Sequence, residues 1–544
     1  MKKRFFYSII SLVLLASACN DNFDPKIYGK LSSTNFPQTE SDYESVLMTC
    51  YIPFQITWSY WLTGNSQYPL NSPPGGCIRM FDVTSDAAAP FRVNSWGSGW
   101  LQLSEANYSD CPLYGRGQDD ARPSNFEKIK DITRMTQIIG LLEDATVLSE
   151  DTKNHFLGEA RLLRGLMMYY LLHIYGPVPV IMDAHLVGNF EAESNLVRPS
   201  LEQMSQWIYD DFDFARQKMS NTAIKGRFTA DYAKFYLMKH CLNEGEYMTG
   251  YYDKAIEMYE ALKASDRNYS LFTQGGNTAY ANQFKQGYKF NIEVIMAVPC
   301  TEAGDGEYKN GNFNPLSFYV IPADAAKYAD VANTIPTPFE KQGGGWGHLF
   351  NVAPLFYDTY EQGDVRRNVI LTSYVQNNSR RIVVTRNDLG VKWSGFILNK
   401  FPVEVANQYQ PTDIPLARWA DVLLMYAEAV ARKNRTVPNG EALKGVNDVR
   451  ARAGLPALDS SVTGNYDKFM DALLAERGHE FLYEGFRKID LIRFNKYRRN
   501  CRLYKGVTPS HQYMPIPNYA VEQAESYGKT LMQTFERQDW NLDN

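Results

Sequence analysis

The stretch that constrains the fold most lies at residues 474–494 of the 544-residue chain. Its apolar residues recur at spacings of three and four, and its charged residues do the same, which predicts a helix. Gly485 lies inside this pattern, where glycine weakens a helix by about 1 kcal/mol, so we expect a kink or two helices. Charged side chains three residues apart are expected to pair along one edge of the helix. We expect the whole stretch to be a buried packing element that takes no part in catalysis. The alternating charges are Glu484, Arg487, Asp490 and Arg493, and an acidic row comprises Glu476, Glu480 and Glu484.

Paired helical patterns recur along the chain. At residues 229–239 and 252–262, the small Ala233 and Ala255 and the large Tyr259 resemble the tetratricopeptide pattern of two antiparallel helices. A single pair cannot bury its own apolar face, so several pairs must stack. We therefore predict a mainly α protein, in which a tetratricopeptide-like scaffold of helical pairs carries an irregular, loop-rich ligand-binding subdomain. Further pairs are expected at 126–148 with 152–175, 415–434 with 440–453, and 466–484 with 486–498.

Two segments, residues 52–125 and 266–412, interrupt the helical pattern. Both are rich in glycine, asparagine and aromatic residues, and long loops inside a compact protein are usually functional. Short β-like runs in the second segment predict strands at 294–298, 318–321 and 381–384. Outside these segments, capping boxes at 41–44 and 200–203 predict helix starts, because a serine oxygen and an acidic or amide side chain satisfy backbone groups reciprocally.

The N-terminus has the residue order of an exported lipoprotein. Basic residues at 2–4 precede an apolar run at 5–15, and small residues then lead to Cys19. This order resembles a bacterial lipobox, although alanine stands where leucine is usual three residues before the cysteine. We predict a signal peptide at 1–18, lipid attachment at Cys19 and a tether at 19–40. The other six cysteines lack the spacing of a zinc site, and the sequence assigns no disulfide pair.

Several motifs together resemble those of the SusD/RagB family of nutrient-capturing lipoproteins. The resemblance spans nearly the whole chain, and its motifs are the C-terminal signature at 474–494, the GEARLLRGLMMYY…IYGPVPVI segment at 158–181, the GGGWG segment at 343–347 and the MPIP segment at 513–517. It implies a SusD-like fold with an N-terminal helical part at 41–265, an irregular ligand-binding subdomain at 266–412 and a C-terminal helical part at 413–544.

The resemblance also implies a function. Family members capture oligosaccharides without catalysis at the cell outer membrane and deliver them to a SusC-like TonB-dependent transporter. Aromatic residues make up 14% of this chain, and their rings suit the C–H faces of sugars, while polar side chains suit the hydroxyls. From the two loop segments we predict five ligand-binding residues: Trp96, Trp100, Arg79, Tyr288 and Trp346.

No sequence pattern indicates catalysis, a metal or a cofactor, and we predict none. The seven histidines lack metal-binding spacing, and there is no nucleophile-elbow motif. The net charge of −5 and the lack of a basic cluster argue against nucleic acid as a partner. Three alternatives stay open: a peptide-capturing RagB-like binder, a glycoside hydrolase on the helical scaffold, and a scaffold protein without a small ligand. The hydrolase stays open because 61 acidic residues allow many carboxylate pairs.

Overall fold

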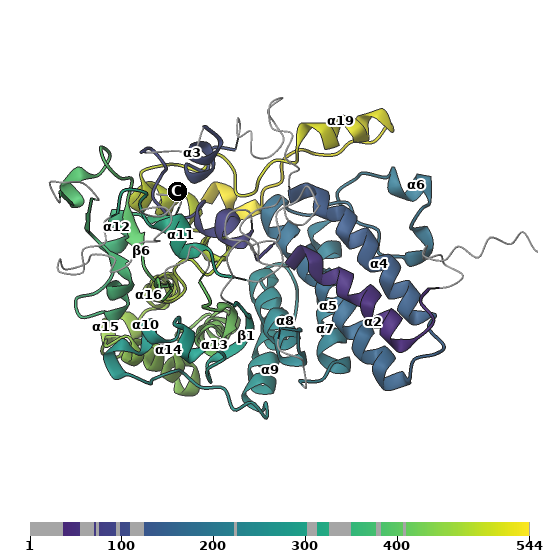
Figure 1. Ribbon diagram of the computed structural model, residues 1–544, viewed down its shortest axis with the longest axis horizontal. Helices are drawn as coiled ribbons and strands as arrows, with labels where there is room; N and C mark the ends of the chain where they lie inside the picture. The colour runs from purple at the N-terminus through teal and green to yellow at the C-terminus, as the bar shows by residue number, and fades with distance from the viewer. Residues whose placement is uncertain are drawn as a thin grey trace, which may run out of the picture.

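The computed structural model describes residues 36–54, 70–71, 76–93, 98–108, 125–221, 226–301, 313–325, 350–376, 382–405 and 410–542. Within these ranges the protein is mainly helical, as predicted (Figure 1). None of the helices described there is both long enough and apolar enough to cross a membrane. The predicted signal peptide, Cys19 and the tether up to residue 35 lie outside the described residues.

Antiparallel helices form the helical array, which occupies the right half of Figure 1 and continues into the lower centre. Each member packs on the next in the order α4 (Ile129–Glu143), α5 (Glu150–Tyr175), α7 (Leu201–Lys218), α8 (Ala230–Glu244), α9 (Tyr251–Lys263), α13 (Trp419–Asn434) and α14 (Gly440–Arg452). The predicted helical pairs among these segments are therefore confirmed. Because α9 packs directly on α13, the array continues across the interruption at 266–412. The predicted domain boundaries stay predictions.

The two predicted capping boxes have different outcomes. The Ser200 side chain accepts a hydrogen bond from the Gln203 backbone at the start of α7, as predicted. The box predicted at 41–44 is wrong: α2 (Glu40–Met48) begins two residues earlier, and Thr39 and Asp42 form its box. Both four-residue windows fit the sequence pattern, but Thr39 has the extended backbone that an N-cap requires.

Short antiparallel strands lie in and beside the second interruption. The pairs are β1 (Val294–Val298) with β7 (Ile414–Arg418), β6 (Phe396–Leu398) with both β2 (Asn351–Val352) and β3 (Ile370–Leu371), and β4 (Tyr374–Val375) with β5 (Val383–Val384). The strands predicted at 294–298 and, in its described part, at 381–384 are confirmed. The strand predicted at 318–321 is wrong, because these residues belong mainly to the buried helix α11 (Leu316–Val320). A short apolar run looks the same in a buried strand and in a buried helix.

The remaining α-helices are short. They are α3 (Ser98–Ser104), α6 (Phe190–Glu193), α10 (Ala279–Asn282), α12 (Pro354–Tyr357), α15 (Ser460–Thr463), α18 (Tyr497–Asn500) and α19 (Asn518–Ser526). Buried residues from the array, the strands and the C-terminal stretch join in one hydrophobic core.

The C-terminal stretch breaks into two helices, as predicted. The helices are α16 (Tyr466–Glu480) and α17 (Arg487–Arg493), and Gly485 lies between them. The backbone of Gly485 has φ +90°. Gly485 also lies so close to Cys77 that a Cβ added to it would be 2.9 Å from the Cys77 Cβ. Only glycine readily combines this backbone with this proximity. The predicted pairing of charges along one edge is confirmed for Asp490 with Arg493 but is wrong for Glu484 and Arg487. Asp490 and Arg493 pair at 2.7 Å, but the break turns Glu484 and Arg487 toward other segments, where both form ion pairs.

Candidate ligand-binding face

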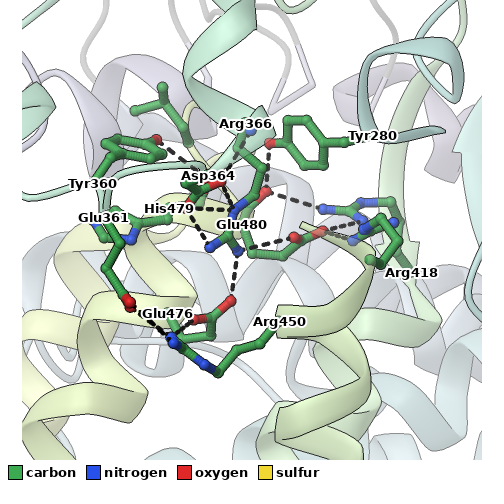
Figure 2. Close-up of polar contacts among 12 residues, drawn as sticks. Tyr280, Tyr360, Glu361, Asp364, Arg366, Arg418, Arg450, Glu476, His479 and Glu480 are labelled. Atoms are coloured by element: carbon green, nitrogen blue, oxygen red, sulfur yellow. Dashed lines mark hydrogen bonds and ion pairs between the residues drawn. The ribbon is translucent and has the colours of Figure 1, made fainter. Parts of the chain in front are cut away.

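Buried ion pairs connect α16 to distant parts of the chain (Figure 2). Glu480 is fully buried and faces the guanidinium groups of Arg366, Arg418 and Arg452. One turn earlier on α16, Glu476 pairs with Arg366 and, at 3.2 Å, with Arg450. We define the ion-pair hub as these six residues together with Asp364, Glu293, Glu484 and Lys400, which pair with its arginines or with one another.

The electrostatics of the hub favour the charged form of Glu480, its central carboxylate. Burial acts to raise the pKa of Glu480, but the three surrounding guanidinium groups outweigh it and hold that pKa far below its usual range. The same balance applies to Asp490 beside the hub, where Arg477 and Arg493 hold the pKa of the carboxyl low. Such permanently ionised, fully paired carboxylates serve packing, because a catalytic acid needs a raised pKa.

Gly485, the start of α17 and Lys505 fix residues 76–93, which we call the clamped segment. The Asp86 carboxylate accepts two hydrogen bonds from the Arg487 guanidinium, at 2.8 and 2.9 Å. The Asp82 carboxylate accepts from the backbone N–H groups of Gly485 and Arg487, at 2.6 and 3.1 Å, and so caps the start of α17. The Lys505 ammonium donates to two carbonyl oxygens of the segment. Thr84, Ser85 and Asp86 thus lie at a rigid attachment point.

The clamped segment joins the two loop regions. Ala88 forms an isolated antiparallel bridge with Val352, and the Ala89 N–H donates to the Asn351 carbonyl at 2.9 Å. Beside this contact, the N–H groups of Arg92 and Val93 donate to the Ser394 hydroxyl at 3.1 and 3.0 Å. We call this contact the loop junction (residues 87–93 with 350–353 and 394–395).

Gly395 is required where the loop junction is tightest. A Cβ at this position would lie 2.5 Å from the Val352 carbonyl oxygen and 2.7 Å from the Ala89 Cβ. The backbones can approach this closely only because glycine has no side chain. Residues 94–97 and 326–349, which adjoin the junction in sequence and contain Trp96 and Trp346, lie outside the described residues.

The other three predicted ligand residues lie in different surroundings. Arg79 is in the π-helical turn Ile78–Asp82 of the clamped segment and is only 1% exposed, so its side chain lies within the protein. Tyr288 is half-buried, packs its ring edge-on against Phe272 at 5.3 Å and lines a small hollow. Trp100 belongs to α3, but its side chain lies outside the described residues. All five stay predicted ligand residues.

Sequence reasoning missed most of the hub. Arg418 and Arg452 follow helical patterns in which charges usually face solvent, and their shared partners Glu293 and Glu480 are far away in sequence. The one local signal is the Asp364-Val-Arg-Arg motif, in which the Arg366 side chain bonds back to Asp364. Among the described residues, no group of three potential ligands is placed to hold a metal ion.

Comparison with known proteins decides the family. A model of the SusD family matches residues 203–535, which is more than half of the chain. The chain belongs to the SusD family. A second family model, described as starch-binding and associating with the outer membrane, matches residues 79–239, which include most of the clamped segment.

Individual SusD relatives are distant in sequence but close in fold. A SusD-like protein of Bacteroides ovatus is 26% identical over 392 residues, which make up 67% of this chain and 64% of that relative, slightly less than two thirds of its length. Starch-binding protein SusD of Bacteroides thetaiotaomicron is 35% identical over 152 residues, 25% of each chain. A laminarin-binding SusD-like protein of known structure superposes with a TM-score of 0.66 at 20% identity, over 92% of this chain and 99% of that one. Surface glycan-binding protein A from B. thetaiotaomicron, in complex with laminarihexaose, gives 0.67 at 16% identity, over 92% and 100% of the two chains.

Proposed function

We propose that this chain captures an oligosaccharide at the outer-membrane surface and passes it, uncut, to a SusC-like TonB-dependent transporter. The match of residues 79–239 to the starch-binding family model carries the proposal, because it covers residues 79–93 of the clamped segment and the first side of the loop junction. The starch-binding and laminarin-binding relatives support a glycan as the ligand.

The loop junction suits capture because it is rigid where the loops are attached. Charged and backbone hydrogen bonds fix the clamped segment, so little ordering entropy remains to be lost there when a ligand binds. Aromatic rings at Trp96, Trp100, Tyr288 and Trp346 would stack on the sugar faces. A lipid anchor at Cys19 would hold the binder beside its transporter, so that weak contacts suffice through effective concentration.

Binding without cleavage agrees with the state of two buried carboxyl groups, Glu480 and Asp82. Glycoside hydrolysis needs a carboxylic acid that stays protonated next to the scissile bond. Three guanidinium groups hold the pKa of Glu480 far below its usual range. Burial raises the pKa of Asp82 to about 7, but this side chain is fully buried and both its oxygens cap α17.

Affinity electrophoresis tests glycan capture. A soluble Cys19→Ala form of residues 19–544 is run through native gels that contain laminarin, starch or no polysaccharide. We expect retardation by at least one polysaccharide, and no release of reducing sugar on incubation with it. Trp96→Ala, Trp100→Ala and Trp346→Ala are each expected to weaken binding about tenfold, the effect of about 1.4 kcal/mol. Trp207→Ala, which removes a half-buried ring from α7, is the matched control. Equal mobility in all gels would overturn glycan capture.

Membrane fractionation and pulldown test the anchor and the delivery step separately. Full-length Cys19→Ala chain is expected to leave the membrane fraction while staying folded. An affinity-tagged wild-type chain, extracted from outer membranes in mild detergent, is expected to retain a TonB-dependent transporter. If the chain binds the glycan but retains no transporter, the proposed delivery step is contradicted and the proposed capture of glycan is not.

A further inference from the structure

A second hollow with aromatic walls lies on the helical array. It has a volume of about 340 Å³, in the lower range of small-ligand sites, and lies between α4, residues 179–196 and the end of α19. In Figure 1, α4, α6 and α19 occupy the right side, opposite β6 and α12 beside the loop junction. The hollow is therefore separate from the proposed ligand-binding face.

Two exposed rings form a corner of this hollow. Phe190 is 72% exposed and Tyr527 is 39% exposed, and their rings meet edge to face with centroids 5.7 Å apart. Soluble proteins seldom leave a phenylalanine so open, and clusters of exposed apolar side chains mark binding surfaces. Four further exposed apolar side chains lie on the same two chain segments: Leu186, Val197, Tyr519 and Met532.

The walls of the hollow are fixed to each other. The Arg198 guanidinium donates to the carbonyl oxygens of Met532 and Gln533, at 2.7 and 3.1 Å, and so ties the segment after α6 to the segment after α19. It also donates to the carbonyl oxygens of Tyr175 and Pro177, at 2.8 and 2.6 Å. The corner of the two rings is therefore built before any ligand arrives.

Unpaired amides complete the lining. Asn195 and Gln523 are exposed lining residues, and neither side chain has a hydrogen-bond partner among the described residues. Each amide offers both a donor and an acceptor, which is what a sugar hydroxyl requires. Of the charged lining residues, Lys130 already pairs with Glu127, and one oxygen of Glu193 accepts from the Gly188 N–H.

We propose that this hollow is a second carbohydrate-binding site, which takes a short stretch of the same neutral glycan that the loop junction binds. Phe190 and Tyr527 stack on the C–H faces, and the amides of Asn195 and Gln523 bond the hydroxyls. A concave site with free neutral amides fits a sugar better than a flat protein partner, whose interface needs about 800 Å² on each side. The choice of ligand rests on the proposed function, whereas the place and the residues are independent of it. Two sites on one chain would raise the affinity for a polysaccharide through effective concentration.

The test compares wild type with the double variant Phe190→Ala/Tyr527→Ala. The probes are laminarihexaose and maltohexaose in isothermal titration calorimetry, and laminarin and starch in affinity gels. We expect two hexasaccharide sites per wild-type chain, one per double-variant chain, and about tenfold weaker binding of the polymer by the double variant. Asn195→Ala/Gln523→Ala is expected to weaken the second site in the same direction. Met532→Ala is the matched control, because Met532 is 62% exposed on the same face but does not line the hollow.

The possible results are distinguishable. If the double variant keeps wild-type stoichiometry and polymer affinity, or if Trp346→Ala alone removes all binding, the second site is overturned and the proposed function stands. If wild type binds none of the four glycans, both fail. If the double variant binds glycans normally but loses the transporter in the pulldown, the hollow is a protein interface and the proposal is overturned.

Discussion

The helical array and the ion-pair hub are both buried, but different interactions hold them. In the array, most helices pack on the next array helix in sequence through apolar and aromatic side chains, such as Leu166 and Tyr169 of α5. In the hub, charges from five distant segments meet around Glu480 and Glu476. Loss of one apolar group leaves a cavity of limited cost, whereas loss of one hub cation leaves the buried carboxylates with one negative charge more than the remaining cations can balance. The array should therefore tolerate substitution better than the hub.

The largest expected effect is that of Arg418→Met. This change removes the guanidinium shared by Glu293, Glu480 and Glu484, and we expect the free energy of unfolding to fall by about 4 kcal/mol, measured by urea denaturation. The loss should be smaller at pH 5 than at pH 8, because one of the hub carboxyls, now in excess over the remaining cations, can then take up a proton. Lys444→Met, which removes an exposed pair with Asp448, is the control and should cost less than about 0.5 kcal/mol. A loss below 1 kcal/mol for Arg418→Met would contradict the contrast between the two regions.

The matching change in the array is Leu166→Ala. Leu166 is fully buried in α5, so we expect a loss of about 3 kcal/mol from the lost apolar contacts and the cavity. This loss should be equal at pH 5 and pH 8, since no charge is involved. A pH-dependent loss would show that the array is coupled electrostatically to the hub and would weaken the distinction.

A smaller effect is expected where the hub meets the clamped segment. Gly485→Ala places a Cβ 2.9 Å from that of Cys77 in a backbone with φ +90°, and should cost about 2 kcal/mol. Gly188→Ala is the matched control: its φ is +83°, but no atom lies within 4 Å of the added Cβ, so about 1 kcal/mol is expected. Thermal unfolding followed by circular dichroism measures both, and equal shifts would show that the contact with Cys77 adds nothing.

The smallest effect at neutral pH is expected for Lys488→Met. Burial lowers the pKa of Lys488 to about 7, while its ammonium donates to the Tyr108 hydroxyl at 3.1 Å. Between pH 7 and the unfolded pKa of 10.5 the unfolded chain binds more protons, so this residue makes wild type more stable as the pH rises. The variant should lose this rise, and at pH 7 the relief from burying the lysine should be offset by the loss of its hydrogen bond and packing to within about 1 kcal/mol. An unchanged pH profile in urea denaturation would show that Lys488 is not the titrating group.

Local patterns were sufficient to predict most of the array. Apolar spacing predicted α4, α5, α8, α9, α13 and α14, and Gly485 predicted the break before α17, because these features depend on neighbouring residues. The hub could not be predicted, since buried and exposed arginines look alike in sequence and their partners lie up to 159 residues away, as for Arg452 and Glu293. The helix α11 was misjudged because its five buried residues, of which four are apolar, show no visible period. For the proposed ligand-binding face, the sequence predicted aromatic loops, which stay a prediction, but it could not predict the loop junction, which depends on contacts such as Ala88 with Val352.

The position of Arg487 has a consequence for the order in which the molecule assembles. Its bonds to Asp86 close a loop of 401 residues, so the clamped segment cannot take its final place until nearly the entire polypeptide has been synthesised. Helices α4 to α9 can form earlier, because each array helix among them packs on the next one, which follows it in the sequence within a few dozen residues. Maturation of the loop junction should therefore be the last step in folding, and an immature chain would already be helical but would lack the proposed ligand-binding face.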